Sequence, residues 1–224
     1  MLSRDDIFNE LGIAPVWRLR DDPGDSLQAP VLAPIQNWEQ LDDAVAHCTA
    51  CTLHTTRTQS VLGVGDRNAD WLIIGEAPGV EEDQQGEPFV GQSGQMLDAM
   101  LSAIGLARGK NVYITTVLKS HLPGNRDPEP GEVAACRPYL QAQIELIQPK
   151  IILALGHVAA QSLLDSNETI GSLRGRAHQF QGVPLVATYH PAYLLRKPTE
   201  KARAWEDLCL ARRLLQSPPT CVNP

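Results

Sequence analysis

The sequence predicts a three-layer α/β/α protein built around a four-stranded parallel sheet. Four short runs are apolar throughout, as strands are when both faces of their sheet are covered. Segments with apolar residues at helical spacing separate these runs, so strand and helix alternate along the chain. The chain has 224 residues, which is long enough to bury a core of this kind.

The folded domain is expected to span residues 37–217. Its first helix is expected to begin at Asn37, whose side chain can cap it, and to place Leu41 and Val45 on one face. The four strands are expected at 71–75, 112–118, 151–156 and 183–189. The helices that follow the strands are expected at 93–106, 130–149, 157–164 and 198–215.

The composition favours a globular protein that does not wrap nucleic acid through charge alone. The apolar fraction is 43% and the charged fraction 20%. The 26 acidic and 19 basic side chains give a net charge of −7, which argues against strong sequence-independent DNA binding but allows a local basic patch. No run is long enough to cross a bilayer and no signal pattern opens the chain, so we expect a cytoplasmic protein without a membrane partner.

A separate segment precedes the domain. Residues 1–20 combine a short amphipathic helix pattern with an extended piece, and residues 21–36 are rich in proline and small polar residues, as linkers are. The first segment could fold back on the core or could be a docking peptide for a partner. Residues 218–224 are expected to form a tail.

The five cysteines point to metal binding or burial, because an odd number of cysteines in a cytosolic chain argues against a set of disulfide bonds. Cys209 lies where a helix would bury it. Cys221 lies in the proline-flanked tail and is expected to have no role. The others are Cys48, Cys51 and Cys136.

Chemistry-bearing residues gather after the first and fourth predicted strands. A glycine-rich loop with Glu76, Glu82 and Phe89 follows the first, and His190 follows the fourth. The carboxyl ends of parallel strands meet at one edge of a sheet, where ligands bind. A purely structural role for His190 is the alternative.

Six motifs resemble the family-4 uracil-DNA glycosylases. They read GEAPG-x-EED-x-x-G-x-PFVG-x-x-G-x-x-L, YIT-x-V-x-K, PGNRDP, AACRPYL, LALG and HPAYLLR, and together they span about residues 48–212. The resemblance implies the fold of uracil-DNA glycosylases. It also implies an enzyme that flips uracil out of the duplex, stacks it on phenylalanine and reads its edge, while water attacks the sugar and the N-glycosidic bond breaks.

The resemblance also implies roles for individual residues. Phe89 would stack the base, and the Glu76–Ala77 backbone with His190 would face a uracil carbonyl. Glu82 would serve the attacking water or the sugar cation, so that Glu82 and His190 would be the catalytic pair. A wedge entering the DNA stack would comprise Ala192, Tyr193, Leu194, Leu195 and Arg196.

Two positions depart from the family. Thr116 replaces the asparagine whose amide pairs with the uracil edge, and a hydroxyl cannot offer a donor and an acceptor in one plane. Ser120 replaces one of four cysteines that hold an iron–sulfur cluster, which leaves Cys48, Cys51 and Cys136.

We therefore expect no cofactor. One alternative is a 4Fe–4S cluster in which Ser120, His121 or water is the fourth ligand. Another is a zinc ion held by the remaining cysteine pair with His54.

The stretch IFNELGIAPVWRLRDDP resembles the N-terminal peptide of the psi subunit of bacterial DNA polymerase III. It implies docking on the clamp loader, with the chi subunit as a further partner and with DNA contacted directly or through single-stranded DNA-binding protein. The predicted anchors are Leu11, Ile13, Trp17 and Leu19.

Together, these features predict a psi-like replisome accessory protein, nucleoid-associated, on a degenerate glycosylase fold. The alternative hypothesis is an active glycosylase that excises uracil, or another damaged base, from DNA.

Overall fold

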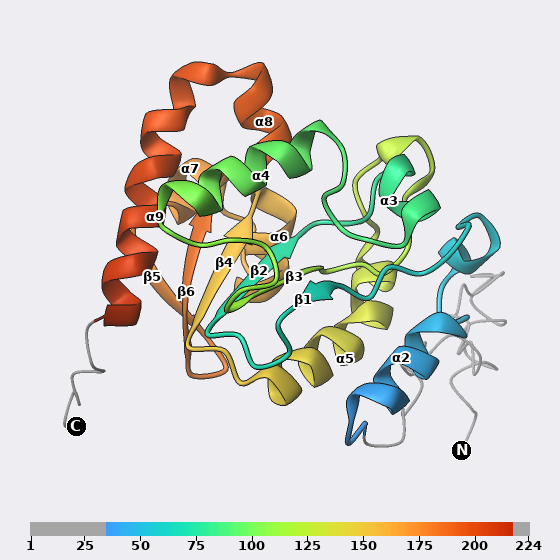
Figure 1. Cartoon of the computed structure of the whole chain (residues 1–224). Coiled ribbons are helices and arrows are strands. Elements are labelled where there is room, and N and C mark those ends of the chain that lie inside the picture. The colour runs from blue at the N-terminus through green and yellow to red at the C-terminus, as the bar shows by residue number, and fades with distance from the viewer. Residues whose placement is uncertain (1–34, 217–224) are drawn as a thin grey trace, which may run out of the picture.

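A six-stranded sheet forms the centre of the molecule (Figure 1), and the computed structural model describes residues 35–216. The strands stand in the order β1-β3-β2-β4-β6-β5. Their bounds are β1 Val64–Gly65, β2 Trp71–Gly75, β3 Val112–Thr116, β4 Ile151–Leu155, β5 Ala177–Phe180 and β6 Val183–Thr188.

The four central strands are those that the sequence predicts, and they run parallel to one another. The predicted total of four strands is wrong, because β1 and β5 pair antiparallel along the two edges of the sheet. Neither edge strand has an apolar run. β1 has two residues, and three of the four residues of β5 are exposed or half-buried. Short, polar strands of this kind suit the solvent-facing edge of a sheet.

Alternate residues of the central strands pack on opposite faces of the sheet. In β2, Trp71 and Ile73 belong to one apolar cluster, whereas Leu72 and Ile74 belong to the other. Successive side chains of a strand point to opposite faces, so a run that is apolar throughout is buried on both. This confirms the three-layer arrangement.

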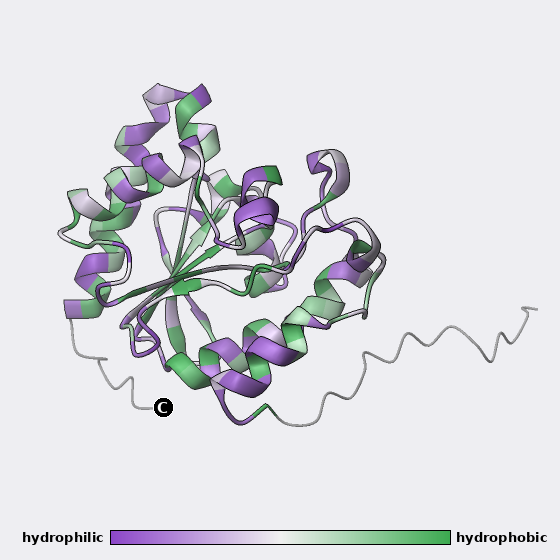
Figure 2. Cartoon of the chain, turned by 45° about the vertical axis from the view of Figure 1, so that its right-hand side comes forward, coloured by the Kyte–Doolittle hydropathy of each residue, from purple (hydrophilic) through white to green (hydrophobic). Residues whose placement is uncertain are grey.

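Helices from different parts of the chain cover the two faces. The face with Trp71 is covered by α4 (Gln92–Ala103), α8 (Pro191–Arg196) and α9 (Lys201–Gln216). The other face is covered by α5 (Pro130–Ile147), α6 (His157–Leu164) and the short α7 (Ile170–Leu173). Figure 2 shows apolar strands at the centre and helices that are banded with polar residues.

Helix α2 (Trp38–Ala46) begins the described domain and packs on α5. Its N-cap is Asn37, whose side chain accepts a hydrogen bond from the Gln40 N–H, as predicted. Leu41 and Val45 lie on its buried face, against Tyr139 of α5. A 3₁₀ turn at Thr52–Thr55 and the short helix α3 (Val80–Gln85) complete this side of the molecule.

Several predictions fall outside the described residues. The docking peptide 1–20, with its anchors Leu11, Ile13, Trp17 and Leu19, lies outside them. So do most of the linker 21–36 and the whole tail 218–224. Within residues 35–216, no helix combines the length and the apolar character that a membrane crossing requires.

A buried carboxylate ties α9 to the end of β6. Asp207 is fully buried and accepts hydrogen bonds from Arg174 at 2.9 and 3.0 Å, from the Gly175 N–H at 3.0 Å and from the Thr188 hydroxyl at 2.8 Å. Four donors satisfy the charge in the interior. Thr188 is two residues before His190, so this contact fixes the backbone that leads to His190.

We predict that Asp207→Ala lowers the free energy of unfolding by about 3–5 kcal/mol, because it removes the buried carboxylate of the Arg174 ion pair and leaves the Gly175 N–H and the Thr188 hydroxyl without their acceptor. Glu206→Ala is the matched control. Glu206 also pairs with Arg174 but its side chain is 68% exposed, so its loss is expected to cost less than about 1 kcal/mol. Chemical denaturation measures both, and equal effects would contradict the role of Asp207.

Candidate active site

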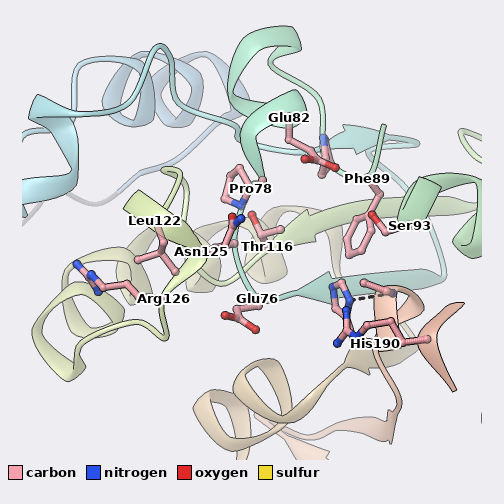
Figure 3. A pocket seen from close by; sticks show the side chains of 15 residues that line it. Glu76, Pro78, Glu82, Phe89, Ser93, Thr116, Leu122, Asn125, Arg126 and His190 are labelled. Atoms are coloured by element: carbon pink, nitrogen blue, oxygen red, sulfur yellow. Dashed lines mark hydrogen bonds between the residues drawn. The ribbon is translucent and has the colours of Figure 1, made fainter. Parts of the chain in front are cut away.

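A cavity of about 450 Å³ opens where the carboxyl ends of β2, β3 and β6 meet (Figure 3). It has the size of a small-molecule site. The predicted residues Glu76, Glu82, Phe89, Thr116 and His190 all line it, so the structure brings them together as the parallel-sheet argument requires. The remaining lining residues include Ala77, Pro78, Gly79, Pro88, Ser93, Leu122, Asn125, Arg126, Ala192 and Arg196.

Phe89 forms a fixed aromatic wall. Its φ of +57° is a left-handed conformation that a bulky residue seldom adopts, and such strain is typical of functional sites. The Arg108 guanidinium holds this backbone by donating to the carbonyls of Pro88 at 3.0 Å and Phe89 at 2.8 Å. The ring lies over Gly75, where a Cβ would come within 2.5 Å of it, so only glycine fits there.

His190 faces the Phe89 ring at a centroid distance of 5.6 Å. It is the N-cap of α8, and its Nδ1 accepts the Ala192 N–H at 3.2 Å. Burial, together with Arg196 and His157, lowers the pKa of His190 to about 4, so the ring is neutral at pH 7. Because Nδ1 accepts, the ring proton lies on Nε2 and is available to a ligand.

Two carboxylates lie in the cavity in different settings. Glu82, on α3, accepts the Val90 N–H at 3.2 Å and so helps to fix the loop that carries Phe89. Glu76 follows β2 directly, and burial raises its pKa above the ordinary value. Figure 3 shows the Glu76 side chain inside the cavity without a hydrogen bond to the other residues drawn. The sequence predicted only a backbone role for Glu76, but its side chain is the less restrained carboxylate.

Thr116 lies at the end of β3 with its side chain 2% exposed. Its hydroxyl donates to the Leu118 carbonyl at 2.6 Å, so the hydroxyl proton is already used within the protein. The methyl group points toward Gly75. This agrees with the prediction that Thr116 does not provide a paired donor and acceptor.

A buried ammonium, which the sequence analysis did not single out, supports Thr116 from behind. Lys119 is fully buried and donates to the Thr116 carbonyl at 2.6 Å, the Thr115 hydroxyl at 2.7 Å and the Gln143 side chain at 2.6 Å. Burial lowers the pKa of Lys119 to about 7. These contacts fix the end of β3 at the cavity.

The predicted wedge, residues 192–196, forms most of α8. Leu194 is fully buried in the core, and Tyr193 stacks on Tyr189 at 5.1 Å, so both attach the helix to the domain. Leu195 is 41% exposed, and Arg196 is exposed at the end of the helix. Leu195 is therefore the large apolar side chain of this segment that remains exposed, and the role of the segment as a wedge stays a prediction.

The cysteines lie near one another, but their donor set does not match a four-thiolate cluster. Cys136 is 4% exposed within an apolar cluster that Cys51 also contacts, and burial raises its pKa to about 11. Ser120, at the fourth position, is buried and accepts a hydrogen bond from Arg57 at 3.0 Å. The same guanidinium donates to the Cys48 carbonyl at 2.8 Å, so a positively charged group contacts both Ser120 and Cys48.

The two histidines considered as extra ligands are engaged elsewhere. Nδ1 of His121 is 3.1 Å from the Pro78 carbonyl, and Nδ1 of His54 is 2.7 Å from the Cys51 carbonyl. Across residues 35–216, no group of three or more histidine, cysteine or acidic side chains is arranged to hold a metal ion. The residues therefore do not fit the family's cluster, and whether any metal is bound stays a prediction.

Comparison with known proteins gives a consistent result. Residues 62–209 match the model of the uracil DNA glycosylase superfamily. A Type-4 uracil-DNA glycosylase of Archaeoglobus fulgidus is 44% identical over 71% of this chain and 85% of its own length. Those of Pyrobaculum aerophilum and Thermotoga maritima are 40% and 41% identical, over 77% and 80% of this chain and 91% and 94% of their own lengths.

These relatives overturn the psi-like prediction. Five of them, at 38–44% identity, are described as Type-4 uracil-DNA glycosylases, which supports the alternative hypothesis of an active glycosylase. The prediction gave too much weight to Thr116 and Ser120, whereas Phe89, His190 and Glu76 keep an intact cavity. Nothing tests the predicted clamp-loader and chi partners, because the peptide that suggested them lies outside the described residues.

The contact of Ser120 with Arg57 generates a prediction about iron. We expect the wild-type chain to purify without a stoichiometric cluster, and Ser120→Cys, which restores a fourth thiol, to bind about four iron atoms per chain. Iron and sulfide content and visible absorbance after anaerobic reconstitution measure this. Ser162→Cys on α6, away from the other cysteines, is the control. A wild-type protein that holds as much iron as Ser120→Cys would refute the prediction.

Proposed function

The chain belongs to the uracil DNA glycosylase superfamily, and from this premise we propose that it is an active enzyme that removes uracil from DNA. The observation that carries the proposal is the placement of Phe89 and His190 on one cavity, with ring centroids 5.6 Å apart. An aromatic face and a neutral imidazole donor are what a flipped base requires.

The neutral state of His190 suits the leaving group. When the bond between C1′ and the base breaks, its electron pair leaves with uracil and negative charge develops on the base. The Nε2–H of a neutral imidazole stabilises that charge through a hydrogen bond without first protonating the base. The Ala192 N–H holds the ring in the required orientation at 3.2 Å.

Glu76 is the carboxylate that we assign to the attacking water. It has no restraining hydrogen bond in Figure 3, and burial keeps its pKa higher than that of an ordinary glutamate. A base of raised pKa accepts a proton more readily as the water oxygen bonds to C1′. We assign Glu82, the predicted catalytic residue, to holding the Phe89 loop through Val90.

The surroundings of the cavity suit a polymeric substrate. A second cavity of about 550 Å³ shares Glu76, His190 and Arg196 with the first, so there is room beside the base for the strand that carries it. Leu195 is the exposed apolar side chain of α8 and fills the gap that a flipped nucleotide leaves in the stack.

We predict that the purified protein releases uracil from single- and double-stranded DNA. His190→Ala should lower the rate by about a hundred- to a thousandfold, because a donor to the developing charge is lost. Glu76→Gln should lower it by about a hundredfold or more, because the general base is lost. Glu87→Gln, an exposed acid on the same loop, is the control and should leave the rate unchanged. A wild-type rate no higher than that of His190→Ala would end the proposal.

The pH profile provides a further prediction. The raised pKa of Glu76 means that the base is lost to protonation at a pH above the ordinary glutamate range. His190 stays neutral down to about pH 4, so it does not shape the profile above that value. We therefore expect kcat/KM to be level near neutral pH and to fall on acidification along a single limb. An identical limb in the residual activity of Glu76→Gln would contradict this assignment.

A further inference from the structure

The cavity must satisfy the polar edge of the base that it encloses. Uracil carries an N–H flanked by carbonyl oxygens, and a buried polar edge without partners costs binding free energy. Thr116 stands where the family's motif has the reading amide, but its hydroxyl proton is donated to Leu118. The partner for this edge must come from another side chain.

Asn125 is the one amide among the side chains that line the cavity in the described part of the chain. An amide presents a donor and an acceptor in one plane, which matches an N–H next to a carbonyl oxygen. Figure 3 places Asn125 and Thr116 on the same side of the cavity, across from Phe89, and draws no hydrogen bond from Asn125 to the other residues shown. The amide is therefore available to a ligand.

The loop that carries Asn125 is held on both sides. Before it, Leu122 is 3% exposed in the apolar cluster that includes Cys136, and its carbonyl accepts the Asn125 N–H at 2.9 Å. After it, Arg126 forms a two-pronged ion pair with the buried Glu132 of α5, whose carboxylate also caps that helix through the Glu129 N–H. A binding residue on a loop anchored in this way is already in position before the ligand arrives.

The backbone of Asn125 is itself unusual. Its φ is +51°, and it follows Gly124 at φ +68°. Asparagine tolerates this left-handed conformation better than most residues, although it costs some free energy. Strain of this kind persists where the surrounding structure enforces it, and it is common at binding sites.

We infer that Asn125 is a specificity-determining residue whose side-chain amide pairs with the uracil edge in place of a side chain at position 116. This inference rests on the proposed function. Thr116 then closes the wall of the cavity with its methyl group, while recognition of the edge comes from the PGNRDP loop.

The test compares two variants that keep the left-handed backbone. Asn125→Gly removes the amide without backbone strain, and Asn125→Asp keeps the shape but loses the donor. Each should lower kcat/KM for uracil release by about ten- to a hundredfold, the effect of leaving a polar edge unpaired. Asn167→Gly, an exposed amide outside the cavity, is the control. Thermal unfolding checks that each variant folds.

A second measurement separates edge reading from a merely structural role. In the Thr116→Asn background the new amide takes over the pairing, so Asn125→Gly should then have little effect. Equal losses of kcat/KM in both backgrounds, or no loss in the wild-type background, would overturn the inference. Uracil release by the wild-type chain would still support the proposed function.

The inference about Asn125 can also be tested if the proposed glycosylase activity is absent. If the wild-type chain releases no uracil, titration with free uracil, monitored by calorimetry, decides the inference. Binding that Asn125→Gly weakens by about tenfold or more supports edge reading in a protein that is not a glycosylase. Binding that Asn125→Gly leaves unchanged, or no binding at all, overturns it.

Discussion

The close contact between the Phe89 ring and Gly75 is the constraint on which the site depends. A Cβ at Gly75 would lie 2.5 Å from the ring, and one at Gly94 would lie 1.9 Å from the Phe89 carbonyl oxygen. Gly75 at the end of β2 and Gly94 in α4 thus leave the space in which the chain places a phenylalanine in a left-handed conformation against the sheet. Arg108 holds that backbone, and the His190 ring lies opposite this wall in the same cavity.

The sheet explains why residues far apart in the sequence share this wall. Glu76, Thr116 and His190 lie at the carboxyl ends of three different parallel strands, and these ends meet at one edge of the sheet. The link from Asp207 to Thr188 extends the same logic, because it fixes the last residues of β6 before His190. The core therefore sets the positions of the side chains that line the cavity.

Much of this arrangement could be predicted from the sequence, since buried parallel strands are apolar throughout and leave a clear pattern. The edge strands β1 and β5 could not, because their polar residues look like loop. The sequence analysis gave Glu76 a role through its backbone alone and did not name Asn125, whereas the structure places both side chains on the cavity. Their roles depend on how two loops fold toward one cavity, and local spacing does not record this. Burial of Leu194 and exposure of Leu195 likewise depend on how α8 packs.

The hydroxyls at positions 116 and 120 were the reason to predict a lost activity, and their surroundings in the structure weaken that reason. Ser120 accepts a hydrogen bond from Arg57, and neither residue is among those that line the cavity. Thr116 stands where the family's motif has an asparagine, but the same cavity is also lined by the amide side chain of Asn125. The effect of a single substitution on activity therefore cannot be judged before the residues around it in space are known.

A crystal structure of Glu76→Gln with DNA that carries an uncleavable deoxyuridine analogue tests the central claim most directly. The account predicts uracil stacked on Phe89, with His190 Nε2 within hydrogen-bonding distance of a carbonyl and the Asn125 amide along the opposite edge. A base that remains in the duplex, or that enters the cavity without contacting either residue, would contradict it.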